Sequence, residues 1–451
     1  MDTKLSYNNL ISEKAFYTAV VVLIAGMPVV EFFTEIVSWY NALIIPSFFQ
    51  PQILALFGIM GSFLTVLYWF SAWRQRRKMR FADIFYFTLV IFMIISAVFS
   101  LNPGEYSYGS VFYCENPFHF LAYYWLYFAG TLINEIKYRK NIIFCFLAVS
   151  ILEGTVAFLQ TFGIELSYSL YYHAEGAAYG LTQNSNFYGG LSVLFIACIS
   201  GVYIFADDIV NSKLKEIALL IVASLVFYTL LGSRARLAWV GFAGLVLFYL
   251  VSLAVMYRRN KGNKNFLKII KRFFILLGVL FAVFVITFLF TNYVVEVTER
   301  SYWEVANGNT DKIGSDRIYN WKMGLASVPG HWLTGVGLDN YRYVFLSSPD
   351  YQYGMYLQDK AHNEYLQILV TQGVPALVNY IALLIYAGFG AVNRIIKESS
   401  HERMAVTWIF LGMFIAYSAQ AFFNSSVTYV AMNFWLVIGL ITPRSDIRNS
   451  L

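Results

Sequence analysis

Three arginines and a histidine have residue types and neighbours that suit chemistry on an anionic substrate. Arg234 and Arg236 stand two residues apart in GSRARLAW, and Arg317 lies in SDRIYNWKMG. A guanidinium group stays charged at physiological pH and binds phosphate through two parallel hydrogen bonds. His362 lies in DKAHNEYLQILVTQG, and a neutral imidazole is a common general base. These residues are candidates for an anion site with a base beside it.

The arginines also have a structural interpretation. Arg234 and Arg236 lie between two apolar segments, where arginine side chains often extend to lipid headgroups. Two guanidinium groups at one short turn favour the anion site, although the two-residue spacing does not tell which side chain points inward. For Arg317 the alternatives are a solvated loop charge or an ion pair with Asp316 or Asp339.

His362 is predicted to lie at the start of a short helix. Asp359 has the residue type and position of an N-cap, which puts His362 in the first turn of a helix that ends at Gly373, before Pro375. A helix N-terminus disfavours the imidazolium ion and so favours the neutral form that a base needs. The alternative is a surface histidine at a helix start.

Other polar residues beside or inside apolar segments have several interpretations. Glu153 is protonated, hydrogen-bonded to Gln160 or part of a polar entry, because a bare carboxylate is costly inside a membrane. Asn184 and Asn186 open the apolar segment near 186–205, either as caps or as substrate contacts.

Metal and cofactor chemistry has no signal in the sequence. We find no cluster of metal-ligating residues, no phosphate-binding P-loop and no Ser-His-Asp order, so we predict neither a metal site nor a cofactor. Cys114, Cys145 and Cys198 have no metal-ligand spacing and are interpreted as small apolar residues.

The elements that carry these residues are predicted membrane helices. Of 451 residues, 59% are hydrophobic and only 13% charged, and the mean hydropathy is +0.58. Soluble domains average about 25% charged residues, whereas apolar blocks of ~20 residues match the ~30 Å hydrocarbon core of a bilayer. We therefore predict an all-α polytopic membrane protein, a single domain over residues 1–451, whose first helix is retained rather than cleaved. About twelve helices are expected, near 15–33, 52–72, 81–100, 118–134, 143–163, 186–205, 217–232, 236–256, 269–291, 374–393, 404–422 and 426–442.

The basic residues orient these helices. Of the 32 Lys and Arg residues, 24 fall in the alternate segments that include both termini, and 8 fall in the others. Basic residues are enriched in cytoplasmic loops, so we predict that both termini are cytoplasmic and that Arg234 and residues 292–373 face outward. Long loops usually carry function, so 292–373, between helices nine and ten, is the expected catalytic loop. Because the net charge of +6 reflects these short basic runs, no nucleic-acid partner is predicted.

Four segments, in chain order, resemble the O-antigen ligase and polymerase family of bacterial membrane glycan transferases. The last resembles the family's His-Asn-x9-Gly-x-x-Gly element through His362, Asn363 and Gly373, with Ala376 where the family usually has glycine. The four segments are GLTQNSNFYGG, GSRARLAW, SDRIYNWKMGLASVPGHWLTGVGLDNY and HNEYLQILVTQGVPAL.

The resemblance implies an inverting, metal-independent transfer of a glycan from undecaprenyl pyrophosphate to an acceptor hydroxyl, such as that of lipid A–core. It implies that Arg234 and Arg317 bind the pyrophosphate and that His362 is the base. It also implies a multi-pass protein of the bacterial inner membrane whose active site faces the periplasm or exterior, with the lipid-linked glycan donor, a glycan or lipid acceptor and membrane lipids as partners. The implied substrate-binding residues are Arg236, Asn363 and Asn186.

Two other functions remain open at this point. A polymerase that joins repeat units would use the same donor chemistry. A lipid-linked sugar flippase or exporter would be expected to show internal repeats, broken helices or charges along a path through the membrane, and only Glu153 fits that description. Glycan transfer without nucleotide or metal distinguishes the enzymes from the flippase.

Overall fold

A computed structural model provides the arrangement of the helices. It describes residues 12–41, 49–74, 78–103, 115–166, 176–182, 184–259, 264–306, 313–346, 357–424 and 427–442. Cys114 lies outside the described residues, whereas Cys145 and Cys198 are free thiols inside helices.

The described residues form helices and no strand, which confirms the all-α prediction. Ten of these helices are long and apolar enough to cross a membrane, so the chain is a polytopic membrane protein. The two remaining predicted segments form shorter apolar helices, α5 (Pro117–Leu132) and α16 (Thr428–Ile441). The ten are α1 (Glu13–Asn41), α2 (Phe49–Arg74), α3 (Phe81–Val98), α6 (Ile136–Gln160), α7 (Ser185–Phe205), α8 (Lys213–Gly232), α9 (Arg236–Arg259), α10 (Lys264–Phe290), α14 (Glu364–Lys397) and α15 (His401–Gln420).

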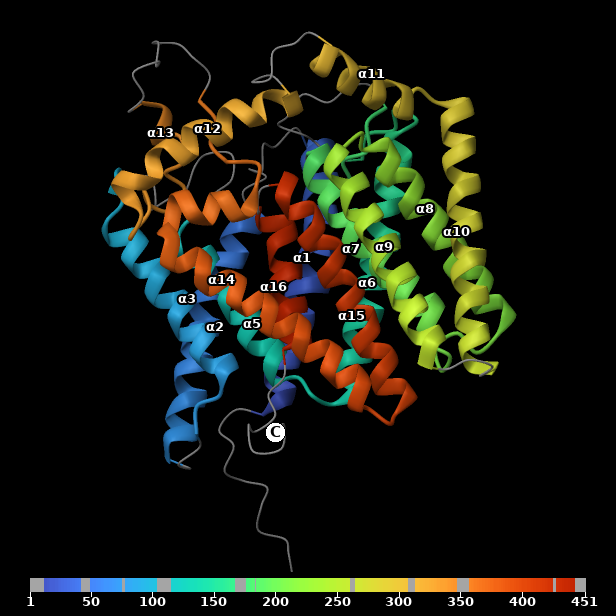
Figure 1. Ribbon diagram of the computed structural model, residues 1–451, viewed down its shortest axis with the longest axis horizontal. Coiled ribbons are helices and arrows are strands. Elements are labelled where there is room, and N and C mark those ends of the chain that lie inside the picture. The colour runs from blue at the N-terminus through green and yellow to red at the C-terminus, as the bar shows by residue number, and fades with distance from the viewer. Residues whose placement is uncertain are drawn as a thin grey trace, which may run out of the picture.

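Helix α7 lies at the centre of the bundle. Every residue from Phe187 to Ile204 is buried, and α7 packs against α8, α9 and α15 (Figure 1). A helix that is apolar on all sides suits a position enclosed by other helices. Its N-terminal end therefore has a fixed position beside the turn that carries Arg234, since Gly189 of α7 lies against Ser233 and Ala235.

A second contact, between α5 and α16, depends on small residues. A Cβ atom on Gly130 would lie 2.8 Å from the carbonyl oxygen of Leu436 and 3.0 Å from Gly439. The two helix backbones therefore approach at van der Waals distance, as membrane helices do where glycines face one another.

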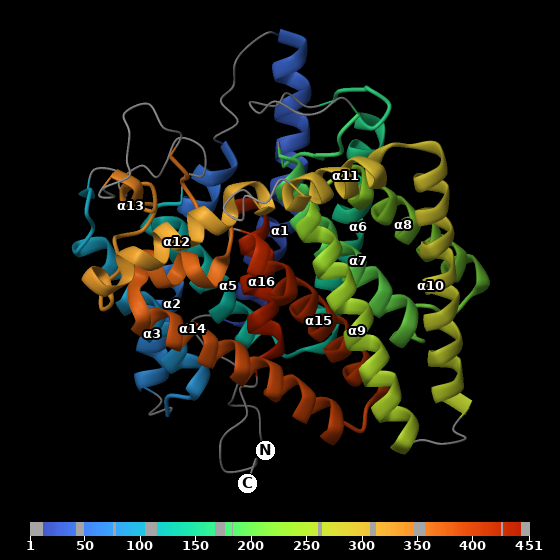
Figure 2. The same ribbon diagram turned by 45° about the horizontal axis from the view of Figure 1, so that its top comes forward.

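Three short helices lie across one end of the bundle, which we call the α11–α13 end. They are α11 (Tyr293–Ala306), α12 (Ile313–His331) and α13 (Tyr343–Leu346), all within the predicted loop 292–373. Figures 1 and 2 show α11 and α12 lying across the ends of the long helices. The large loop is therefore largely helical in its described part, and it covers the end at which α8, α9 and α14 present the candidate residues.

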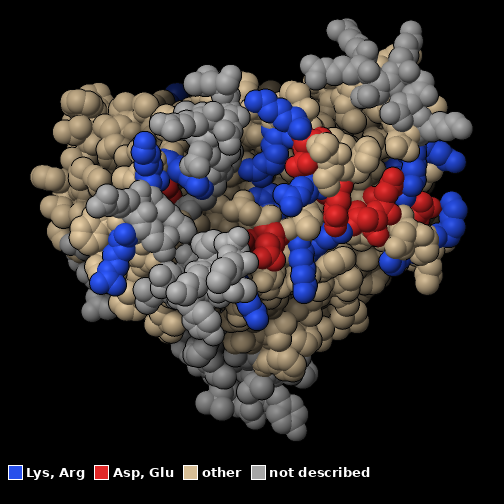
Figure 3. All heavy atoms as spheres, turned by 90° about the horizontal axis from the view of Figure 1, so that it is seen from below, with Lys and Arg blue, Asp and Glu red and all other residues tan. Residues whose placement is uncertain are grey.

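The opposite end of the bundle carries many basic side chains (Figure 3). There Arg272 pairs with Asp207 and Glu216 at 2.6 and 3.1 Å, and Lys140 pairs with Asp208 and Glu402. These ion pairs join described parts of four of the segments that the charge pattern assigns to the cytoplasm, those at Lys140, 207–216, Arg272 and Glu402.

The start of α14 differs from the prediction. The N-cap is Asn363, whose side chain accepts a hydrogen bond from Leu366 N at 3.0 Å, and not Asp359, which pairs with Arg342 at 2.8 Å. His362 therefore precedes the helix instead of lying in its first turn. The predicted break at Gly373 is present, because Gly373 has a φ of 88° and interrupts the helical backbone of α14.

Candidate functional site

The turn between α8 and α9 carries the two paired arginines. Arg234 has a φ of 55°, in the left-handed region that non-glycine residues rarely adopt. The turn is stabilised locally, because Ser233 Oγ donates to Leu230 O at 2.7 Å and Arg234 N donates to Leu231 O at 3.0 Å. The reversal in chain direction directs Arg234 and Arg236 to different partners.

Those partners are two glutamates of α11. Arg234 pairs with Glu296 at 2.9 Å and its guanidinium lies 4.9 Å from the centre of the Tyr293 ring. Arg236 binds Glu304 through both terminal nitrogens, at 2.6 and 3.0 Å. Since a helix rises 1.5 Å per residue, glutamates eight positions apart lie about 12 Å apart along α11. The arginines therefore contact separate parts of the loop.

Arg317 on α12 lies near Arg236. Burial lowers the pKa of Arg317 to about 10, and the charge of Arg236 acts in the same direction. Within the described part of the chain, Arg317 forms no ion pair, whereas Arg234 and Arg236 each form one. The alternative of a pair with Asp339 does not apply, because Asp339 pairs with Lys360. A partly buried guanidinium group of this kind suits an anionic ligand.

His362 lies within electrostatic range of Arg317. Burial lowers the pKa of His362 to about 4, and the charges of Arg317 and Lys360 act in the same direction. The ring is therefore neutral at pH 7, as predicted, although burial and two cations cause this more than the helix N-terminus. His362 is half-buried and has a φ of 51°, so its backbone adopts a conformation that surrounding contacts must maintain.

The structure thus groups three of the candidate residues. The charge of Arg236 acts on Arg317, and the charge of Arg317 acts on His362, whereas Arg234 pairs with Glu296. The sequence ranked Arg234 above Arg236 because spacing carries no information on direction. Of the two arginines of the turn, Arg236 is the one whose charge lowers the pKa of Arg317.

The two candidate asparagines have different surroundings. Asn363 caps α14 through its side chain. Asn186 is exposed at the first turn of α7, and the N-cap there is Asn184, which accepts from Asn186 N at 2.8 Å. The Asn186 side chain therefore remains available at the same end of the bundle as the arginines.

Several residues at this site were missed by sequence reasoning. The residues that were not singled out from the sequence are Glu296, Glu304, Lys360 and Glu115. Glu304 also accepts a hydrogen bond from Gly314 N at 2.9 Å and so joins α11 to α12. No local pattern identifies a pairing between residues that are tens to hundreds of positions apart.

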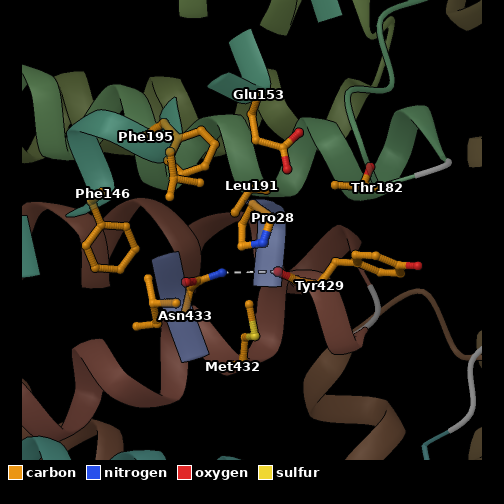
Figure 4. A pocket seen from close by; sticks show the side chains of 11 residues that line it. Pro28, Phe146, Glu153, Thr182, Leu191, Phe195, Tyr429, Met432 and Asn433 are labelled. Atoms are coloured by element: carbon orange, nitrogen blue, oxygen red, sulfur yellow. Dashed lines mark hydrogen bonds between the residues drawn. The ribbon is translucent and has the colours of Figure 1, made fainter. Parts of the chain in front are cut away.

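Glu153 lines a separate small pocket between α1, α6, α7 and α16 (Figure 4). Its carboxylate accepts a hydrogen bond from Leu181 N at 2.9 Å, and Gln160 binds Tyr179 and Gly180, so the two side chains hold residues 179–181 instead of each other. The pocket has room for about one water molecule. Figure 4 shows Asn433 on its far side, donating to Tyr429 O at 3.1 Å.

Metal-ligating side chains do not gather in the described ranges. No three His, Cys, Asp or Glu side chains there come close enough together to hold a metal ion. The charged groups at the α11–α13 end that suit a diphosphate are the guanidinium groups.

Ten membrane-spanning helices, with arginines and a neutral histidine gathered under a helical loop at one end, define a polytopic membrane protein with a candidate site for an anionic substrate. Residues 221–381 match the family model described as O-antigen ligase. This matched segment contains all three arginines and His362, so the part of the chain that carries the candidate site is similar to the O-antigen ligases, a match that supports a membrane glycosyltransferase of that type. No curated protein matches the chain.

Proposed function

We propose that the chain transfers a glycan from a polyprenyl pyrophosphate carrier to an acceptor hydroxyl, with a lipid A–core saccharide as the acceptor class. The observation that carries this proposal is the grouping of Arg236, Arg317 and His362 at the α11–α13 end. Two guanidinium groups suit the charge of a diphosphate leaving group, and a neutral imidazole suits activation of a hydroxyl.

The surroundings of Arg236 support a lipid-linked donor. An open groove between α9 and α11 is lined by Arg236 together with Trp239, Val297 and Val305. A cation in the wall of a largely apolar groove suits a phosphate joined to a prenyl chain. The exposed Tyr302 and Trp303 of α11 have the residue types of a membrane–water interface, where such a phosphate would lie.

The proposed reaction is a single displacement. The acceptor oxygen forms a bond to the anomeric carbon of the donor sugar while the bond from that carbon to the phosphate oxygen breaks, so the configuration inverts. The acceptor proton passes to an imidazole nitrogen of His362, and the bond electrons leave with the polyprenyl diphosphate, which Arg236 and Arg317 hold. We further propose that Arg234, in the same turn as Arg236, contributes to binding of the pyrophosphate, and that Asn186 and Asn363 contribute to substrate binding.

The active end is proposed to face the periplasm or cell exterior of a bacterial inner membrane. The charge bias supports this orientation, since basic residues favour the cytoplasmic side. Joining of repeat units is the second candidate reaction, because Ala376, which is buried, stands where the ligase element usually has glycine.

The test uses purified protein in liposomes with a polyprenyl-pyrophosphate glycan and a lipid A–core acceptor. Transfer of the glycan without nucleotide or added metal supports the proposal, and elongation of the donor glycan supports the polymerase. Movement of the donor across the bilayer without transfer would instead identify a flippase. His362→Ala should lose about 10²–10⁴-fold in turnover and retain donor binding, whereas wild-type turnover of His362→Gln would remove the role of base.

A further inference from the structure

The turn that carries His362 is held on its backbone by side chains from two helices. Lys360 O accepts a hydrogen bond from Asn320 Nδ2, and Ala361 O accepts one from Trp321 Nε1, both at 2.8 Å. Ala361 N donates to Gln367 Oε1, also at 2.8 Å. Because α12 also carries Arg317, the same helix positions the anion site and the backbone just before His362.

The Lys360 side chain anchors the turn from its other side. Lys360 and Glu115 form an ion pair in which the side chains are each 2% exposed, and Lys360 also lies 3.3 Å from Asp339. Tyr123 Oη donates to Glu115 Oε1 at 2.8 Å. The anchor therefore joins three segments, and one of them, at Glu115, lies outside the matched residues 221–381.

A buried ion pair has structural consequences at both of its partners. Removal of one charge leaves the other uncompensated in a low-dielectric environment, so the pair strongly favours one arrangement of the segments that it joins. His362 stands two residues after Lys360 and adopts a left-handed φ of 51°. Since an L-residue avoids this conformation unless its surroundings impose it, the turn depends on restraint from outside.

We propose that Lys360, held by Glu115 and Asp339, is a positioning residue for His362, so that a carboxylate outside the matched family segment completes the active site. This inference rests on the proposed function only for the reaction that His362 performs. The geometry of the turn is independent of that reaction.

The charges around His362 allow a specific readout. Arg317 faces it from α12 and Lys360 from the turn itself, and both lower the pKa of His362 after burial. On α14, the Glu364 carboxylate accepts from Tyr417 Oη at 2.9 Å and also from Tyr380. Loss of the Lys360 charge should therefore raise the pH at which His362 becomes protonated, and loss of the Glu115 charge should not.

The experiment follows the modification of His362 by diethyl pyrocarbonate, which attacks neutral imidazole, in the full-length protein across a range of pH. Lys360→Met should shift the midpoint of modification to higher pH and lower kcat by about 10²-fold, with donor affinity retained. In Glu115→Gln, Lys360 keeps its contact with Asp339. This variant should lower kcat by less than Lys360→Met does, and its modification midpoint should not move to higher pH. Lys140→Met removes an ion pair at the opposite end of the bundle and should change neither quantity.

Two results would overturn the proposal. A wild-type modification profile in Lys360→Met would show that Lys360 does not act on His362, even if no protein variant transfers glycan. A midpoint near the ordinary value of about 6.5 in both Lys360→Met and Glu115→Gln, together with lost donor binding, would show that the pair only maintains the fold. Failure of the proposed function alone would abolish transfer in the wild type and leave the modification profiles as predicted.

Discussion

Glu304 accepts hydrogen bonds from both terminal nitrogens of Arg236, with N–O distances of 2.6 and 3.0 Å. This two-point geometry is the one that a phosphate would use. Binding of the proposed diphosphate donor at Arg236 would therefore require it to displace the Glu304 carboxylate of α11.

Removal of the Glu304 charge should tighten donor binding. Glu304→Gln retains an oxygen for Gly314 N and loses the competing charge, so a pair worth about 1 kcal/mol corresponds to about fivefold in the donor Kd. Glu296→Gln, at the other end of α11, is the matched control and should change the Kd less. Weaker binding by Glu304→Gln would show that Glu304 organises the site instead of competing for it.

Lysine should replace Arg317 and Arg236 poorly. Lysine keeps the charge and loses the planar fork, so we expect a loss of about 10²-fold in kcat/KM for each. Arg234→Lys should cost less, because Arg234 contacts Glu296 away from Arg317 and His362. Transfer assays at matched protein levels measure all three, and near-wild-type activity of Arg317→Lys would refute the assignment.

The pH dependence of transfer should differ between free enzyme and complex. The base must be neutral, and the pKa of His362 is about 4 without ligand, so kcat/KM should fall only below that pH. A diphosphate on Arg317 offsets one of the cations that lower the pKa of His362, so kcat should begin to fall at higher pH. Identical acid limits for kcat and kcat/KM would contradict this electrostatic coupling.

Gly373→Ala should destabilise the protein. Gly373 has a φ of 88°, and a Cβ atom there would lie 2.7 Å from the Leu333 carbonyl. We expect a cost of about 1–3 kcal/mol, measured as a lower melting temperature in detergent. Gly278→Ala on α10 is the control, because a Cβ atom there meets nothing within 4 Å and alanine favours helix. Equal melting temperatures of the two variants would show that the break in α14 is dispensable.

The orientation in the membrane is tested by cysteine labelling in intact cells. Arg300 on α11 and Lys213 at the start of α8 have exposed side chains at opposite ends of the bundle. An impermeant maleimide should label Arg300→Cys and not Lys213→Cys. The reverse pattern would place the candidate site in the cytoplasm.

The sequence by itself determined which segments are membrane helices, and that the helical backbone is interrupted before the membrane-spanning part of α14. Hydropathy decides whether about 20 residues suit a bilayer, and this is a local property. The break at Gly373 followed from glycine and proline, whose backbone preferences are also local. The arginines and His362 were found because their residue types limit what chemistry they can perform.

Only the tertiary structure decided which of these residues act on one another. The charge of Arg236 acts on Arg317, whereas Arg234 pairs with Glu296, because the backbone of the α8–α9 turn sets the direction of each side chain, and a spacing of two does not encode it. Asp359 has the residue type of an N-cap, yet it pairs with Arg342 and leaves the cap to Asn363. The pair of Lys360 with Glu115 spans 245 positions. Its free energy depends on burial and on distance in space, and neither quantity has a local pattern in the chain.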